Sequence, residues 1–309
     1  GGGMLHSIIA VACAFAGPQR AAPAVAGSRL ASRPAGDVRM VSMAPEIREV
    51  DLCAGDVEAL AGFYETCFGM QRLKGAEKGC VRMGFPGDRL RLNLLQKDRS
   101  DFRIGEGLEA IGLCVPDVKT SAARAEVRGG EMLRAPGEVI VGASKIPDEP
   151  KETKHSSFEA LVQDPEGYRF RLIEREGEPR VSKVVYRASN LERSQEFYAE
   201  VLGMTVLRWR SNLQSTPMET SLTMQFGDPL AMVDPNGAPA ILELVYPYDT
   251  QSVDAGEGGA GRLVVAAGDL PGVVEGVPSA RGRVVDASPD GDTAHVADPD
   301  GFELKLVAN

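Results

Sequence analysis

The hydrophobic and polar positions of this chain follow one order of predicted elements twice. In the first copy, residues 47–53 alternate between apolar and polar side chains, which predicts a strand. Asp56 then precedes apolar residues at helical spacing and Gly69 follows them, as expected for a capped helix. The pattern further predicts a helix at 117–127 and strands at 80–85, 89–96, 110–115, 157–162 and 168–174.

The second copy begins near residue 180. We expect its helices at 191–202 and 270–275. Its strands are predicted at 183–187, 205–210, 221–226, 240–246, 262–267, 283–286, 294–296 and 303–307. Two long segments distinguish the copies, 135–155 in the first and 226–239 in the second. We interpret both as loops, and loops of that length are often functional.

Two short motifs recur in the copies at matching places. Phe63-Tyr64 with Gly69-Met70 returns as Phe197-Tyr198 with Gly203-Met204, and Asp164-Pro-Glu-Gly returns as Asp298-Pro-Asp-Gly. Gly69 is as far from Asp164 as Gly203 is from Asp298. This constant spacing indicates tandem duplication of a globular module, not a short-repeat solenoid. We therefore expect functional residues where the two modules meet.

The first 44 residues stand outside this duplication. Leu5–Ala16 is apolar but too short to span a bilayer, and residues 17–39 carry four arginines and a single acid. This composition predicts a signal peptide joined to a transit peptide, and it resembles the bipartite plastid leader of algae with secondary plastids. A plain secretory signal with a polar tail is the alternative. The predicted divisions are 1–44 for the leader, 45–178 for module 1 and 179–309 for module 2, with the mature protein in the plastid stroma.

Composition excludes two classes of partner. The chain carries 34 Lys and Arg against 44 Asp and Glu, a net charge of −10 at pH 7, which argues against nucleic-acid binding. After the leader no apolar run is long enough to span a membrane. The cysteines beyond the leader form no Cys-x-x-Cys pair, so we expect free thiols and no zinc site at Cys53, Cys67, Cys80 and Cys114.

Taken in order, the motifs resemble the glyoxalase I branch of the vicinal oxygen chelate superfamily. The resemblance covers residues 46–309 and includes the segment Ile241–Tyr246 as well as the two repeated motifs. The order is similar to that of the two-module plant-type lactoylglutathione lyases. It implies an α+β fold of tandem modules, built from paired βαβββ units, with binding sites between the modules.

That family places four metal ligands at each of two sites, two from each module. The matching positions are Glu49, Asn93, Arg262 and Lys305 at one site, and Lys183, Glu243, Ala110 and Arg171 at the other. A protonated Lys or Arg has no lone pair for a metal and repels a divalent cation. We therefore predict no metal and no other cofactor at either site. The histidines, His6, His155 and His295, do not occupy the ligand positions.

Each predicted site instead combines one carboxylate with two cations. One interpretation is that salt bridges neutralise a carboxylate that lost its metal. The other is that the net positive charge binds a small anion. Arg187 matches a carboxylate-binding arginine of the family, whereas Cys53 stands there in the first copy, so Arg187 favours the second site. The predicted substrate-binding residues are Arg187, Lys183, Glu243, Arg171, Glu49, Asn93, Arg262 and Lys305.

Three functions are compatible with these residues. The first is metal-free binding of a small anionic metabolite in the plastid, a glutathione adduct being one candidate. The second is active lactoylglutathione lyase chemistry, which the overall resemblance favours and the ligand positions disfavour. The third is a pseudo-enzyme that docks in a plastid assembly with a protein partner.

Overall fold

The computed structural model describes residues 45–76, 79–145, 153–212, 218–227, 240–248 and 250–309. The predicted leader lies outside these residues, as does most of the predicted loop 226–239. Within the described part of the chain, no helix is long and apolar enough to cross a bilayer.

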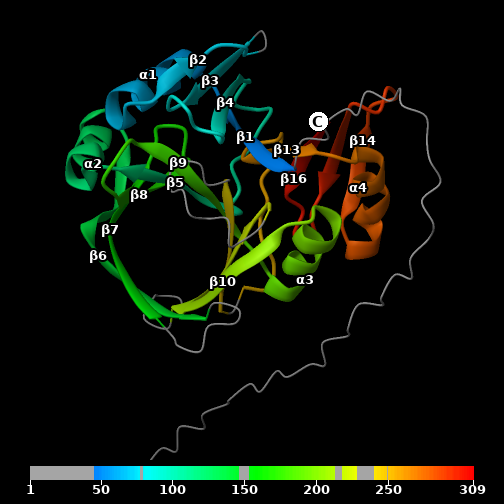
Figure 1. The fold of residues 1–309 in the computed structure, drawn as a ribbon. Helices are drawn as coiled ribbons and strands as arrows, with labels where there is room; N and C mark the ends of the chain where they lie inside the picture. Colours follow the sequence, from blue (N-terminus) through cyan, green and yellow to red (C-terminus); the bar gives the residue numbers. More distant parts are fainter. Residues whose placement is uncertain (1–44, 77–78, 146–152, 213–217, 228–239, 249) are drawn as a thin grey trace, which may run out of the picture. The chain divides into compact units, whose positions relative to one another are not determined.

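Within the ranges that the structure describes, each copy contains eight strands and two helical regions (Figure 1). The first copy comprises β1 (Glu46–Ala54), α1 (Val57–Phe68), β2 (Gln71–Leu73), β3 (Cys80–Gly84), β4 (Arg91–Gln96), β5 (Leu108–Val115), α2 (Val118–Val127), β6 (Glu131–Lys145), β7 (Thr153–Gln163) and β8 (Arg169–Glu174). The second comprises β9 (Arg180–Arg187), α3 (Leu191–Glu196), the π-helix η1 (Phe197–Val201), β10 (Thr205–Asn212), β11 (Glu219–Gln225), β12 (Ile241–Pro247), β13 (Arg262–Ala267), α4 (Leu270–Gly276), the 3₁₀-helix η3 (Val277–Ala280), β14 (Arg283–Ala287), β15 (Thr293–Ala297) and β16 (Glu303–Ala308).

The first helix begins and ends where its sequence predicts. The Asp56 carboxylate accepts hydrogen bonds from the backbone N–H groups of Glu58 (3.1 Å) and Ala59 (3.0 Å). At the other end Gly69 has φ 75°, a left-handed conformation that terminates the helix at little cost only in glycine. The apolar positions between them are buried, so α1 packs one face against the strands.

The two copies exchange halves to form two mixed sheets. One sheet has eight strands in the order β14-β15-β16-β13-β1-β4-β3-β2, and the other is a closed barrel in the order β10-β11-β12-β9-β5-β8-β7-β6 (Figure 1). β1 pairs with β13 and β5 pairs with β9, both antiparallel, so each sheet joins half of one copy to half of the other. The sequence prediction of an α+β fold of tandem modules built from paired βαβββ units is therefore confirmed.

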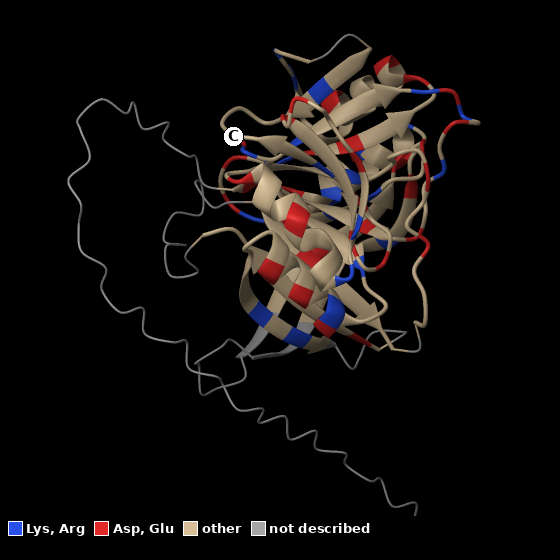
Figure 2. Cartoon of the chain, turned by 90° about the vertical axis from the view of Figure 1, so that its right-hand side faces the viewer, with Lys and Arg blue, Asp and Glu red and all other residues tan. Residues whose placement is uncertain are grey.

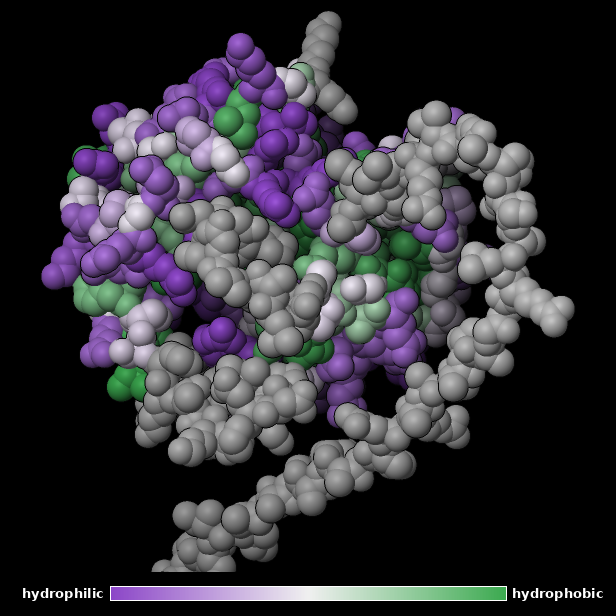
Figure 3. Space-filling view, in the orientation of Figure 1, coloured by the Kyte–Doolittle hydropathy of each residue, from purple (hydrophilic) through white to green (hydrophobic). Residues whose placement is uncertain are grey.

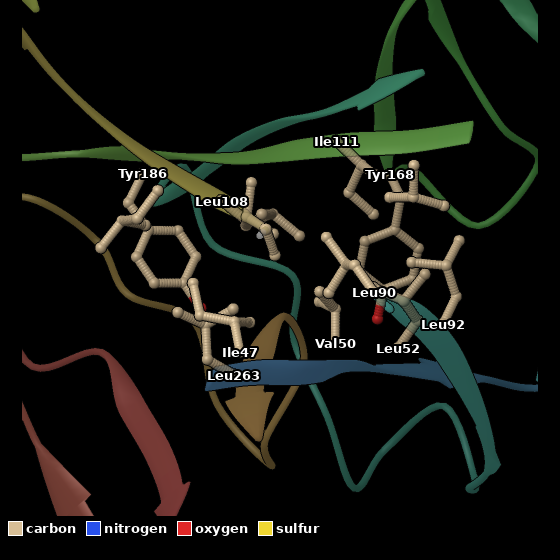
Figure 4. Close-up of a cluster of buried hydrophobic side chains, with 14 of the residues drawn as sticks. Ile47, Val50, Leu52, Leu90, Leu92, Leu108, Ile111, Tyr168, Tyr186 and Leu263 are labelled. Carbon is tan, nitrogen blue, oxygen red and sulfur yellow. The ribbon is translucent and has the colours of Figure 1, made fainter. Parts of the chain in front are cut away.

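The main core lies between the two sheets and under the helices. Val50 and Leu52 of β1 face Ile111 of β5, and Tyr186 of β9 lies near Leu263 of β13 (Figure 4). These side chains are at most 1% exposed. Full burial of such a side chain contributes about 1.5–3 kcal/mol to folding, so this contact between the two sheets stabilises each copy. Over α1 and α2 the outer surface is largely hydrophilic (Figure 3).

Two segments differ from the sequence prediction. The predicted loop 135–155 is wrong for most of its length, because β6 continues to Lys145 and β7 begins at Thr153. Backbone pairing with β7 and the contact of β6 with β10 explain this, since closing the barrel satisfies hydrogen bonds that a loop would leave to water. The helix predicted at 191–202 is present, but it changes from α to π geometry at Phe197.

Candidate functional site

The repeated motifs join the two halves of each module through a buried hydrogen bond. The hydroxyl of Tyr64 donates to Asp164 at 2.6 Å, and in the second copy Tyr198 donates to Asp298 at 3.0 Å. Both carboxylates also accept backbone N–H groups of their own turns. The Phe-Tyr and Asp-Pro motifs thus meet in space, which explains why they recur together.

The interior face of the barrel carries the charged residues. Strand residues of the main core, such as Leu242, Leu244 and Val184, point away from it toward the helices and the other sheet. Because side chains alternate along a strand, Glu243 and Lys183 face the interior. A small apolar cluster lies on the same face, formed by Ala110, Val185 and Val245 with Leu161 packed against it. Charged residues of both signs are seen along the strands in Figure 2.

Two rows of neighbouring residues cross this interior face. The register places Arg208, Thr223, Glu243, Val185 and Ala110 side by side on β10, β11, β12, β9 and β5. It also places Lys183, Gly112, Arg171, Leu161 and Arg134 side by side on β9, β5, β8, β7 and β6. We call these the Glu243 row and the Arg171 row. Neighbouring side chains on one face of a sheet are within contact distance.

Glu243 joins the two rows through ion pairs. Its carboxylate lies 2.5 Å from Nζ of Lys183 and 3.8 Å from a guanidinium nitrogen of Arg171. Burial opposes its ionisation, but attraction by Lys183 and Arg171 outweighs burial and lowers the pKa of Glu243 to about 2. The structure therefore brings together three of the predicted site residues, with the fourth position, Ala110, on the neighbouring strand.

Gly112 makes this contact sterically feasible. A Cβ atom at position 112 would lie 2.5 Å from Cγ of Lys183, closer than side-chain atoms approach in proteins. The missing side chain leaves room over β5 for the aliphatic part of Lys183, whose Nζ contacts Glu243. This role could not be recognised in the sequence, because it depends on the register between β5 and β9.

Arg187 lies on the same strand but belongs to another ion-pair cluster. Its guanidinium contacts Glu109 at 2.5 Å and Glu106 at 3.2 Å. Arg187 therefore pairs with these two acids and not with Glu243, although Glu109 also acts on Arg171. Its role in anion binding stays a prediction. Glu106 and Glu109 were not recognised as its partners, because they precede β5 or lie at its bulged start, where strand alternation does not predict direction.

The predicted triad on the open sheet is also paired differently. Glu49 contacts Arg82 at 2.9 Å, and Arg262 contacts Asp51 at 2.6 Å, so Glu49 has no ion pair with Arg262 or Lys305. Asn93 lies between the two acids, donating to Glu49 and, at 3.1 Å, to Asp51. The predicted pairing of Glu49 with Arg262 is wrong because Asp51 and Arg82, which were not among the predicted site residues, take these partners.

Lys305 and His295 lie farther along the same sheet. They are direct neighbours in the β15–β16 ladder. Burial, with Arg262 and Lys305 nearby, lowers the pKa of His295. A cavity of about 40 Å³ adjoins Arg262 and Glu303, which is room for water but not for a metabolite. The barrel is therefore the better candidate for a binding site.

Comparison with known proteins identifies the protein superfamily. The profile of the glyoxalase/bleomycin resistance protein/dioxygenase superfamily matches residues 46–172, and that of the glyoxalase-like domain matches 183–307. The chain belongs to this superfamily. It is 27% identical over 269 residues to a probable chloroplastic lactoylglutathione lyase of Arabidopsis thaliana, covering 82% of this chain and 70% of the relative. It is 26% identical over 289 residues to a lactoylglutathione lyase of the same plant, covering 82% and 88%.

A solved structure agrees with this assignment. Glyoxalase I from Zea mays superposes with a TM-score of 0.68 at 25% identity, covering 85% of this chain and 92% of the maize chain. The fold of residues from both copies is therefore similar to that of maize glyoxalase I over most of both chains.

The residues at the positions that the family resemblance assigns to metal ligands do not fit a divalent cation. In the barrel they carry Lys183 and Arg171, whose positive groups already contact Glu243. On the open sheet the carboxylates of Glu49 and Asp51 are bound by Arg82 and Arg262. Among the described residues, no three His, Cys, Asp or Glu side chains gather as a candidate metal site. A metal would have to displace cations at either position.

The barrel also contains arginines that the sequence analysis missed. Arg208 and Arg210 of β10 project to the interior, where Nε of each is buried without a hydrogen-bond partner. Nε of Arg171 is in the same state. Alternating arginines along residues 205–210 were a visible signal, but the direction they face follows only from barrel closure.

Cys53, Cys67 and Cys114 carry free thiols, as predicted. Cys53 is buried, and desolvation raises the pKa of its thiol, with Lys97 opposing that effect. A thiol with a raised pKa is a poor nucleophile near neutral pH. Cys53 therefore belongs to the packing of β1.

Proposed function

We propose that this protein binds a small anionic metabolite inside the barrel and does so without a metal ion. The observation that carries the proposal is the charge of the two interior rows. Lys183 and Arg171 contact Glu243 at the place where the family implies a metal, and Arg208 lies on the same row; with Arg210 and Arg134 they outnumber the carboxylates Glu243, Glu159 and Glu219 of this face. A cation-rich, partly enclosed interior attracts anions although the whole chain is acidic.

Solvent reaches these groups, which binding requires. The side chains of Lys183 and Arg171 are 15% and 20% exposed, while Glu243 is 7% exposed. The cations are thus accessible and partly desolvated, and guanidinium groups in that state make strong hydrogen bonds to carboxylates and phosphates. In this proposal Arg171 and Arg208 contact the anion, and Glu243 positions Lys183.

The plastid is the proposed location. The composition of residues 1–44 supports it, and one of the relatives is named as chloroplastic.

Metal analysis together with an activity assay tests the proposal. We expect purified full-length protein to hold less than stoichiometric zinc, nickel, manganese or magnesium, and to show negligible turnover of methylglyoxal with glutathione even after these metals are added. Binding of small anions should be saturable and unaffected by a chelator. Stoichiometric metal with chelator-sensitive turnover would instead establish lyase activity.

Active lactoylglutathione lyase is the second candidate, because relatives over most of the chain carry that name. The Lys and Arg groups at the ligand positions weigh against it. The same assay separates the two functions.

A further inference from the structure

We infer that the anion bound in the barrel is a small dianion, either a dicarboxylate or a phosphomonoester, held between Arg171 and Arg208 beside Glu243. The inference rests on the proposed function and narrows its ligand to one charge class. It depends on three features of the two interior rows: their uncompensated charge, their unused donors and the hydroxyl groups between them.

The first feature is the balance of charge. Glu243 is held at 2.5 Å by Lys183, so one positive charge of the group is compensated. Arg171 approaches the same carboxylate only to 3.8 Å, beyond hydrogen-bond distance. Arg208 lies two strands away from Glu243 in register, with Thr223 between them. Other charged residues line the same face: Arg134 pairs with Glu159 at 3.1 Å, and Glu159 and Glu219 both act on Arg171. Five cations (Lys183, Arg171, Arg208, Arg210 and Arg134) thus face three carboxylates (Glu243, Glu159 and Glu219), which leaves two positive charges that a monoanion would only half neutralise.

The second feature is the set of unused hydrogen-bond donors. Each guanidinium carries five N–H groups in a rigid fork. Nε of Arg171 and Nε of Arg208 are both buried and have no hydrogen-bond partner. An unsatisfied buried donor of a charged group costs free energy that a ligand oxygen restores on binding. Two guanidinium groups that face the same interior can donate hydrogen bonds to the two carboxylates of a dicarboxylate or to the oxygen atoms of a phosphate.

The third feature is the neutral surface between the arginines. Thr223 stands between Arg208 and Glu243 and is 9% exposed. Its hydroxyl can donate to a ligand oxygen without adding charge. On the far side of Glu243, Val185 and Ala110 continue the same row as an apolar wall. This wall suits the short carbon skeleton of an organic dianion and offers nothing to a second charged group.

Isothermal titration calorimetry on the full-length chain tests the inference, using acetate, succinate and glycerol 3-phosphate at one ionic strength. We expect saturable binding of at least one dianion and binding of acetate that is weaker by about tenfold or more, since one charge-assisted hydrogen bond is worth that factor. Arg208→Gln should weaken dianion binding by about tenfold and bring it close to that of acetate. Arg208→Lys keeps the charge but loses the planar guanidinium group. Its affinity for the dianion should lie between that of the wild type and that of Arg208→Gln.

Arg72→Gln is the matched control. Arg72 is exposed and pairs with Glu58 and Glu65 of α1, outside the barrel, so its loss should leave binding unchanged. Thermal unfolding of each variant shows whether it is folded. Succinate binding alone assigns a dicarboxylate, and glycerol 3-phosphate binding alone assigns a phosphomonoester.

Two results would overturn the inference in different ways. If acetate binds as tightly as the dianions, or if Arg208→Gln binds like the wild type, the dianion site is wrong although anion binding in the barrel stands. If none of the three anions binds, the proposed function fails with it.

Discussion

Removing the carboxylate of Glu243 is the most direct test of the charge group in the barrel. In the Glu243→Ala variant, Lys183 and Arg171 would face each other without the anion that now lies 2.5 Å and 3.8 Å from them. Both cations are mostly buried, so water can replace the carboxylate only in part. Breaking a buried ion pair on one side costs about 3–5 kcal/mol. Since Lys183 and Arg171 keep some exposure, we expect the lower end of that range.

The titration of Glu243 supports the same magnitude. Its pKa is lowered from 4.5 to about 2, which corresponds to about 3 kcal/mol of stabilisation of the ionised form in the folded state. Because the folded pKa is depressed, this stability is present above pH 4.5 and is lost as the pH falls from 4.5 toward 2. The cost of Glu243→Ala should therefore be largest near pH 7 and should shrink at pH 3.

Urea unfolding of the wild type and the variant at pH 7 and pH 3 measures both effects. Glu58→Ala is the control, because Glu58 makes an exposed ion pair with Arg72, and such pairs change stability by less than about 1 kcal/mol. A cost for Glu243→Ala no larger than that of the control at pH 7 would refute the reasoning, and would mean that water solvates the group fully. An equal cost at both pH values would show that lost packing, not lost charge, is responsible.

Three further predictions concern other parts of the molecule. Gly112→Ala should displace Lys183, destabilise the fold by about 1–3 kcal/mol in urea unfolding and weaken anion binding in calorimetry. Stability and affinity equal to those of the wild type would show that the strands shift to make room. Tyr198→Phe should cost about 1–3 kcal/mol in the same unfolding assay, since Asp298 loses a buried donor, and an unchanged midpoint would show that this hydrogen bond is dispensable. Burial raises the pKa of Asp298 to about 7, so its contribution to stability is complete below pH 3.8 and is lost as the pH rises through 7. The melting temperature of Asp298→Asn should therefore decline less between pH 5 and pH 8 than that of the wild type. An equally steep decline would show that other groups cause the pH dependence.

Local sequence patterns were sufficient for most elements of secondary structure. Asp56 and Gly69 mark the ends of α1 because capping is a property of a few neighbouring residues. Short-range rules failed where a partner strand decided the outcome. Residues 135–145 became part of β6 because β7 and β10 supply hydrogen bonds on either side, and no residue nearby in sequence indicates those partners.

The candidate site shows the same division. The family resemblance led to the prediction that Lys183, Glu243 and Arg171 stand at metal-ligand positions, since position within a repeated motif is a property of the chain itself. It could not determine that Arg187 pairs with Glu109, or that Glu49 pairs with Arg82. Every side chain of a strand has two neighbouring strands, and charge alone does not choose between them.

Only the tertiary structure brought Arg208 to the barrel interior and laid Lys183 across Gly112. Both arrangements depend on register, and a shift by one residue would turn each side chain to the opposite face. The sequence thus determined which charges exist and on which strands they lie. Closure of the barrel decided which of those charges face one another, because burial of the apolar faces between the sheets leaves the opposite faces to line the interior.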